Sequence, residues 1–164
     1  MKSLALVLVF SFFNLSVSAE NHFLTRLKLT FEDFVPDTTE LINASGEKET
    51  PSNISTKYMV VYFTATWCGP CKSTTERLKK IKTKYHDELD IVVISYDSPT
   101  ALKKYMSDKK DWYAVPSDFY TKGVKQKLNK LANQANRPAV PTVIAFDHMG
   151  KLVFPNIFSK KFSL

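Results

Sequence analysis

The chain has only two cysteines, Cys68 and Cys71, and both lie in the segment WCGPCK at 67–72. A cysteine thiolate can attack a disulfide, and a second thiol close by can then displace the product. Cysteines at the same spacing also occur in metal sites and, when a histidine follows, in haem attachment sites. The pair is therefore a redox reagent, part of a metal site or a structural staple.

The rest of the sequence favours redox chemistry over the other two roles. A structural zinc site needs four ligands, and the three histidines are not spaced as a ligand pair: His22, His86 and His148. Haem attachment needs a histidine where this chain has Lys72. A disulfide that closes so short a loop adds little stability. We expect a redox-active disulfide, no metal and no other cofactor.

The cysteines fall between a predicted strand and a predicted helix, and this position can activate Cys68. Residues 57–65 form a continuous β-prone apolar run, typical of a strand buried on both faces. The residues after Cys71 repeat apolar side chains at helical spacing. The unpaired N–H groups at the start of this helix would face the Cys68 sulfur and lower its pKa. We therefore expect Cys68 to attack and Cys71 to resolve the mixed disulfide.

The two residues between the cysteines fit the start of a helix. We expect Gly69 to let the chain turn tightly. Pro70 would occupy the first helical turn, where its missing N–H group costs nothing. This motif biases the redox potential without fixing it, because the surrounding residues also tune it.

The remaining pattern predicts an α/β fold. Further strands are expected at 40–43, 47–50, 90–97, 142–146 and 151–154, helices from Ser98-Pro99 and over 121–134, and a loop at 111–119. A strand–helix–strand unit requires a parallel pair, whereas the turn at Gly150 makes the last two strands an antiparallel hairpin. We expect a mixed central sheet with helices on both faces.

Residues 1–19 have the pattern of a secretory signal. Lys2 precedes an apolar run, and small residues precede Glu20, so we expect cleavage after Ala19. The alternative is an uncleaved anchor, but the run is broken by polar residues and is shorter than the roughly 20 residues that span a membrane. We expect export, periplasmic or secreted, with no membrane attachment after cleavage. Export implies an oxidising compartment. In a eukaryotic secretory pathway, Asn43 and Asn53 would also be glycosylation sequons.

The chain is basic, with 23 Lys and Arg against 16 Asp and Glu and a net charge of +7. Its lysines cluster at 77–84, 103–110 and 122–130, each in a stretch of helical apolar spacing. Such lysines are typical of a solvated helix face, which can attract acidic partners. We expect a monomer that does not bind nucleic acid.

Two motifs together resemble the thioredoxin superfamily: WCGPCK at 67–72 after a buried strand, and Val140-Pro141-Thr142 before a later strand. The resemblance implies a thioredoxin fold and a cis peptide bond before Pro141, which would lie against the cysteine pair. It also implies that the Val140 backbone and Pro141 shape a substrate groove. Trp67 would shield the pair and offer a flat contact to protein substrates.

Four further blocks resemble the tryparedoxin and nucleoredoxin-like branch, with exported thiol reductases as neighbours: LINASGEKE, VVYFTATWCGPCK, IVVISYDS and DWYAVP. The resemblance covers roughly residues 40–154. It divides the chain into an N-terminal extension with short strands at 20–57, a thioredoxin-like domain at 58–154 and a tail at 155–164. The C-terminal helix of thioredoxins is expected to be short or missing, with Phe158 and Phe162 as anchors of the tail.

One departure concerns proton transfer. Thioredoxin has a buried aspartate where this chain has Tyr62, and a tyrosine is not a base near neutral pH. Asp97, at the end of a strand, is a weak candidate for a proton relay, and a cap for the following helix is the favoured role. Tyr96 is expected to pack near the site.

These observations predict an exported thiol–disulfide oxidoreductase that reduces protein or small-molecule disulfides. The glycine-proline dipeptide resembles reducing members of the superfamily, and the electron donor is not identified by the sequence. The alternatives are a redox-gated partner-binding module with little turnover and a disulfide oxidase or isomerase. Peroxide reduction is disfavoured, since peroxidases of this superfamily use a differently placed cysteine motif.

Overall fold

The computed structural model describes residues 30–116 and 140–154. Within these ranges the elements are η1 (Phe31–Asp33), β1 (Leu41–Asn43), β2 (Lys48–Glu49), η2 (Pro51–Asn53), β3 (Tyr58–Thr64), α2 (Gly69–Lys84), β4 (Leu89–Ser95), α3 (Pro99–Met106), β5 (Trp112–Ala114), β6 (Thr142–Asp147) and β7 (Leu152–Phe154). The strands form one mixed sheet in the order β2-β1-β5-β4-β3-β6-β7. β3, β4 and β5 are parallel, and the other pairs are antiparallel. The expected α/β architecture with a mixed central sheet is confirmed.

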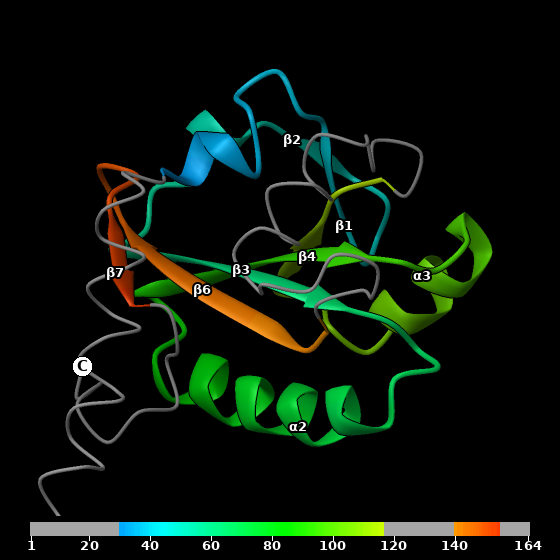
Figure 1. Ribbon diagram of the computed structural model, residues 1–164. Helices are drawn as coiled ribbons and strands as arrows, with labels where there is room; N and C mark the ends of the chain where they lie inside the picture. Colours follow the sequence, from blue (N-terminus) through cyan, green and yellow to red (C-terminus); the bar gives the residue numbers. More distant parts are fainter. Residues whose placement is uncertain (1–29, 117–139, 155–164) are drawn as a thin grey trace, which may run out of the picture.

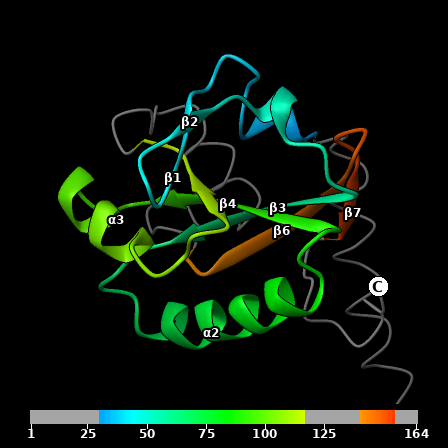
Figure 2. The ribbon, with the colours of Figure 1, turned by 180° about the vertical axis from the view of Figure 1, so that it is seen from behind.

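Successive side chains of the central strands point to opposite faces of the sheet, so the core has two layers. On β3, Val60 and Tyr62 face the side that carries α2 and α3, and Val61 and Phe63 face the other side. α2 lies along one face of the sheet, while the chain around η1 lies beyond the other face (Figures 1 and 2). Phe34, next to η1, packs edge-to-face on Phe63. The helix expected at 121–134 lies outside the described residues.

β5 corrects the expected loop at 111–119. Ile91 and Val93 on β4 pair with Trp112 and Ala114 in parallel, and β1 pairs with the other edge of β5. Trp112 and Ala114 face the α2 layer, whereas Tyr113 packs against the opposite one. So short a strand has too few residues for a recognisable period, and its pairing partners are distant in sequence. Through β5, the hairpin of β1 and β2 joins the same sheet.

Two lysines correct the expectation that the lysine clusters are solvated. Lys82 and Lys109 are each only 6% exposed. The Lys82 ammonium group donates hydrogen bonds to the carbonyls of His86 and Leu89 at 2.9 and 2.7 Å, and pairs with the Asp90 carboxylate at 2.8 Å. It therefore satisfies carbonyls beyond the C-terminal end of α2 and holds the start of β4 against that helix.

Several expectations concern residues outside the described ranges: the signal at 1–19, the first part of the extension, at 20–29, and the tail at 155–164 with Phe158 and Phe162. Over the ranges that are described, no helix has the length and apolarity needed to cross a membrane. Gly150 has the predicted positive φ, 72°, in the turn between β6 and β7.

Candidate redox site

Cys68 and Cys71 form a disulfide at the N-terminal end of α2, with Cα atoms 5.3 Å apart. Cys68 is the N-cap residue, and the backbone N–H of Cys71 donates a hydrogen bond to the Cys68 sulfur at 3.2 Å. In the reduced protein the same N–H group and the helix dipole would stabilise a thiolate at Cys68. The geometry therefore suits Cys68 as the attacking residue.

Sheet topology places three loops around the disulfide. Thr64, at the end of β3, pairs with Ser95 at the end of β4, so the segments that follow these parallel strands leave the sheet together. Phe63 pairs with Thr142 at the antiparallel start of β6, which brings the preceding residues to the same edge. The expected cis peptide bond is present between Val140 and Pro141.

The disulfide packs in a small apolar cluster. Ala65, the half-buried Tyr96 and Val140 contact the pair, leaving Cys68 6% and Cys71 2% exposed. Tyr96 thus lies near the site, as expected. Trp67 is 62% exposed and is available to an incoming partner.

Asp97 does not cap α3, and this corrects the favoured expectation. Ser98 is the N-cap, and its hydroxyl accepts a hydrogen bond from the Ala101 N–H group. The Asp97 carboxylate instead accepts hydrogen bonds from the N–H and hydroxyl groups of Thr66, at 2.8 and 2.7 Å, and from the Ser95 hydroxyl at 2.6 Å. It thereby ties the end of β4 to the loop that leads into Cys68.

The segment between the cysteines is exposed, together with the Lys72 side chain that follows it. Pro70 lies in the first turn of α2, as expected. Gly69 is the first helical residue and does not have a positive φ, and a Cβ atom there would meet nothing within 4 Å. The expectation that Gly69 is needed for a tight turn is therefore wrong.

Tyr62 is fully buried beneath the first turns of α2. Its hydroxyl donates a hydrogen bond to the Cys71 carbonyl at 3.0 Å, and it also contacts the hydroxyls of Thr64 and Thr75 at 3.1 Å. Thr75 in turn contacts the Tyr105 hydroxyl of α3 at 2.9 Å. A group of hydroxyls therefore occupies the place where thioredoxin has a carboxylate.

Sequence reasoning missed four residues of this site: Thr66, Ser95, Thr75 and Tyr105. Thr75 and Tyr105 occupy positions of the apolar helix faces, so the pattern assigns them to the core. The sequence did offer one signal, since Thr75 and Tyr105 each place a hydroxyl at a core position and buried hydroxyls need hydrogen-bond partners. Tyr62 supplies a third hydroxyl on the strand against which they pack.

The profile of a thioredoxin-like family matches residues 55–152 of this chain. The chain belongs to the thioredoxin-like family. The match includes the cysteine pair, β3, α2, β4 and Pro141, so the family's shared core coincides with the site described above.

Among curated proteins, this thioredoxin-like chain is similar to nucleoredoxin from Mus musculus, with 31% identity over 69% of the chain and 26% of the relative. Tryparedoxin from Trypanosoma brucei brucei is 28% identical over 70% of the chain and 76% of the relative. The chain therefore spans about a quarter of the length of the nucleoredoxins it matches.

Solved structures give the same result for the fold. Native tryparedoxin I from Crithidia fasciculata matches with a TM-score of 0.60 and 27% identity, covering 77% of this chain and 86% of that one. Tryparedoxin from Trypanosoma brucei matches with a TM-score of 0.64 and 22% identity, covering 81% and 93%. The tryparedoxin and nucleoredoxin-like branch expected from the sequence is confirmed.

Proposed function

We propose that this thioredoxin-like chain is an exported thiol–disulfide oxidoreductase that reduces disulfides in protein or small-molecule partners. The observation that carries the proposal is the Cys68–Cys71 disulfide at the N-cap of α2, with the Cys71 N–H group on the Cys68 sulfur. The apolar contact with Val140, beside the cis peptide bond, supports a substrate groove at the same edge.

In the proposed reaction, the Cys68 thiolate attacks one sulfur of the partner's disulfide and the other sulfur leaves as a thiolate. Cys71 loses its proton to solvent, and its sulfur attacks Cys68 to release the second partner thiolate. The partner gains two electrons, and the cysteine pair is left as the disulfide seen here. An external dithiol donor then attacks that disulfide and leaves as a disulfide itself, which returns Cys68 and Cys71 to the reduced form.

Reduction of insulin disulfides with dithiothreitol as donor tests this proposal. We expect turnover above the dithiothreitol background for the native chain and none for Cys68→Ser. Cys71→Ser should accumulate a covalent partner adduct, because the resolving thiol is missing. Background rates with the native chain would instead favour a redox-gated binding module.

The proposed export rests on the pattern of residues 1–19. Mass spectrometry of the protein recovered from the medium or periplasm of the expressing cell should show an N-terminus at Glu20. Protein retained inside the cell with residues 1–19 intact would overturn this part of the proposal without affecting the thiol chemistry.

A further inference from the structure

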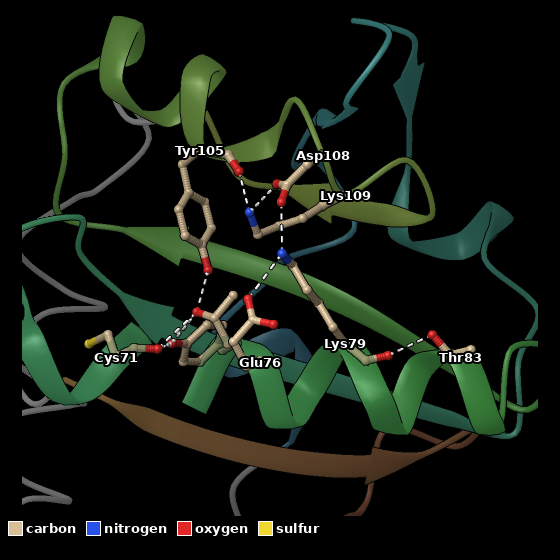
Figure 3. Close-up of polar contacts among 9 residues, drawn as sticks. Cys71, Glu76, Lys79, Thr83, Tyr105, Asp108 and Lys109 are labelled. Carbon is tan, nitrogen blue, oxygen red and sulfur yellow. Dashed lines mark hydrogen bonds and ion pairs between the residues drawn. The ribbon is translucent and has the colours of Figure 1, made fainter. Parts of the chain in front are cut away.

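The Cys71 carbonyl lies at the centre of a buried group of hydroxyls contributed by three elements. It accepts hydrogen bonds from Tyr62 of β3 at 3.0 Å and from Thr75 of α2 at 2.9 Å. Tyr105 of α3 contacts Thr75 at 2.9 Å, and Figure 3 shows its ring directed from α3 toward this carbonyl. We name Tyr62, Thr75 and Tyr105 the hydroxyl network.

The Tyr105 and Thr75 hydroxyls form a hydrogen bond of 2.9 Å that either oxygen can donate. Whichever hydroxyl donates, the bond links Tyr105 to the side chain whose hydroxyl lies 2.9 Å from the Cys71 carbonyl. Burial raises the pKa of Tyr105 well above its usual value, so the hydroxyl stays protonated throughout the neutral range.

Lys109 contacts both the ring and the backbone carbonyl of Tyr105. The buried Lys109 ammonium lies 3.8 Å from the centroid of the Tyr105 ring and donates a hydrogen bond to the Tyr105 carbonyl. Lys109 also pairs with Asp108 at 2.6 Å, and Asp108 pairs with Lys79 of α2 at 2.7 Å (Figure 3). Two contacts therefore join α2 to the C-terminal part of α3 and the residues after it: Thr75 with the Tyr105 hydroxyl, and Lys79 with Asp108.

This arrangement matters most when the disulfide is open. Cys71 lies in the first turn of α2, where the backbone N–H groups lack intrahelical partners and helices fray. In the mixed disulfide Cys71 is no longer bonded to Cys68, so the covalent tie across this turn is lost. The hydroxyl network still holds the Cys71 carbonyl, and because carbonyl and sulfur belong to one residue, it restricts where the sulfur can lie.

We propose that Tyr105 is a positioning residue for the resolving cysteine, acting through Thr75 and together with Tyr62 on the Cys71 carbonyl. The proposal rests on the attack and resolution cycle of the proposed function. The step affected is the second one: the Cys71 sulfur bonds to the Cys68 sulfur, the bond from Cys68 to the partner breaks, and the partner leaves as a thiolate. Tyr105 touches neither sulfur and takes no proton.

The two steps can be measured separately with 5,5′-dithiobis(2-nitrobenzoate) and the reduced protein in a stopped-flow instrument. Attack by Cys68 releases one coloured thiolate, and resolution by Cys71 releases the second. In Tyr105→Phe we expect the second release to slow about 3- to 10-fold, the effect of one ordinary hydrogen bond, with the first unchanged. Tyr113→Phe is the matched control, since Tyr113 packs in the opposite layer, and should leave both rates as in the native protein.

Tyr62→Phe should also slow the second release selectively. The double variant of Tyr62 and Tyr105 should be slowed by less than the product of the two single effects, because both act on one carbonyl. Equal slowing of both releases, no slowing in Tyr105→Phe, or a double effect equal to the product would overturn the positioning role.

The outcomes also separate this proposal from the proposed function. Two releases per native protein without insulin turnover would remove the reductase role and leave the positioning test intact. Normal insulin turnover with an unchanged second release in Tyr105→Phe would remove only the positioning role. A single release per native protein would show that Cys71 does not resolve, and both proposals would fall.

Discussion

Asp97 binds Thr66 through both of its carboxylate oxygens, one on the backbone N–H group at 2.8 Å and one on the hydroxyl at 2.7 Å. Thr66 lies just before Trp67 and Cys68, so this contact fixes the path of the chain into α2. The Asp97 carboxylate, which follows β4, therefore positions the loop that follows the neighbouring strand β3.

Replacing Asp97 with Asn should weaken this contact while keeping the size of the side chain. The amide cannot accept at both ends, so we expect a loss of about 1 kcal/mol in the free energy of unfolding. The first release from 5,5′-dithiobis(2-nitrobenzoate) should also slow by about two- to fivefold, as expected for one lost hydrogen bond. Thr66→Val, which removes only the hydroxyl contact, should show a smaller effect. An Asp97→Asn protein with native stability and rate would contradict the role assigned to this carboxylate.

Asp97 also shows where sequence reasoning reaches its limit. Asp97 and Ser98 are adjacent, and either could cap a helix that starts at Pro99. The choice depends on Thr66, which is distant in sequence and adjacent only after β3 and β4 have paired. The Ser98-Pro99 pair correctly predicts the helix start and its cap, whereas local pattern cannot reveal that the Asp97 carboxylate binds Thr66 instead.

Lys82 should contribute far more to stability than an exposed lysine of the same helix. Lys82→Met removes the partner of the buried Asp90 carboxylate and leaves two carbonyls without their donor. We expect a loss of about 3 kcal/mol in the free energy of unfolding, measured by urea denaturation. Lys80→Met, on the exposed face, should change stability by less than about 0.5 kcal/mol. Similar losses in the two variants would contradict the buried pair.

Asp108 predicts an acid-dependent part of the stability. Hydrogen bonds from Lys109 and then Lys79 lower its pKa from the ordinary 3.8 to about 2. Because the folded pKa is the lower one, the stabilisation is fully present above about pH 4 and is lost as the pH falls toward 2. The carboxylate is largely exposed, so we expect about 1 kcal/mol or less.

Asp108→Asn tests this directly by denaturation at several pH values. The native protein should exceed the variant by a constant amount near neutral pH, and the difference should shrink between about pH 4 and pH 2. A difference that does not depend on pH over this range would show that the charge of Asp108 is not responsible.

Gly69 and Gly150 should respond oppositely to alanine. Gly69 lies in a helix with open space at its Cβ position, so Gly69→Ala should keep or raise stability by up to about 1 kcal/mol. Gly150 has φ of 72°, and Gly150→Ala should cost about 1 kcal/mol. A marked loss of stability in Gly69→Ala would show that the backbone at this position does require glycine. If Gly69→Ala keeps its stability and loses insulin turnover, Gly69 is required for close approach of the partner.

Sequence pattern predicted β3, α2, β4 and the hairpin of β6 and β7 because each has a regular apolar period or a clear turn. β5 was missed because its three residues carry no period and their identity as a strand depends on β1 and β4. The hydroxyl network was missed for a related reason. Thr75 and Tyr105 fit the apolar faces of their helices, and their polar function exists only where α2, α3 and β3 pack together.

The central claim is that the Cys68–Cys71 pair gives electrons to its partners. The reduction potential of this disulfide tests the claim most directly, because it determines the direction of electron transfer. It can be measured by equilibrating the purified protein with glutathione buffers and quantifying the reduced fraction. A disulfide reductase predicts a value near the roughly −270 mV of thioredoxin. A value near about −120 mV, typical of a strong disulfide-forming oxidant, would contradict the proposed direction.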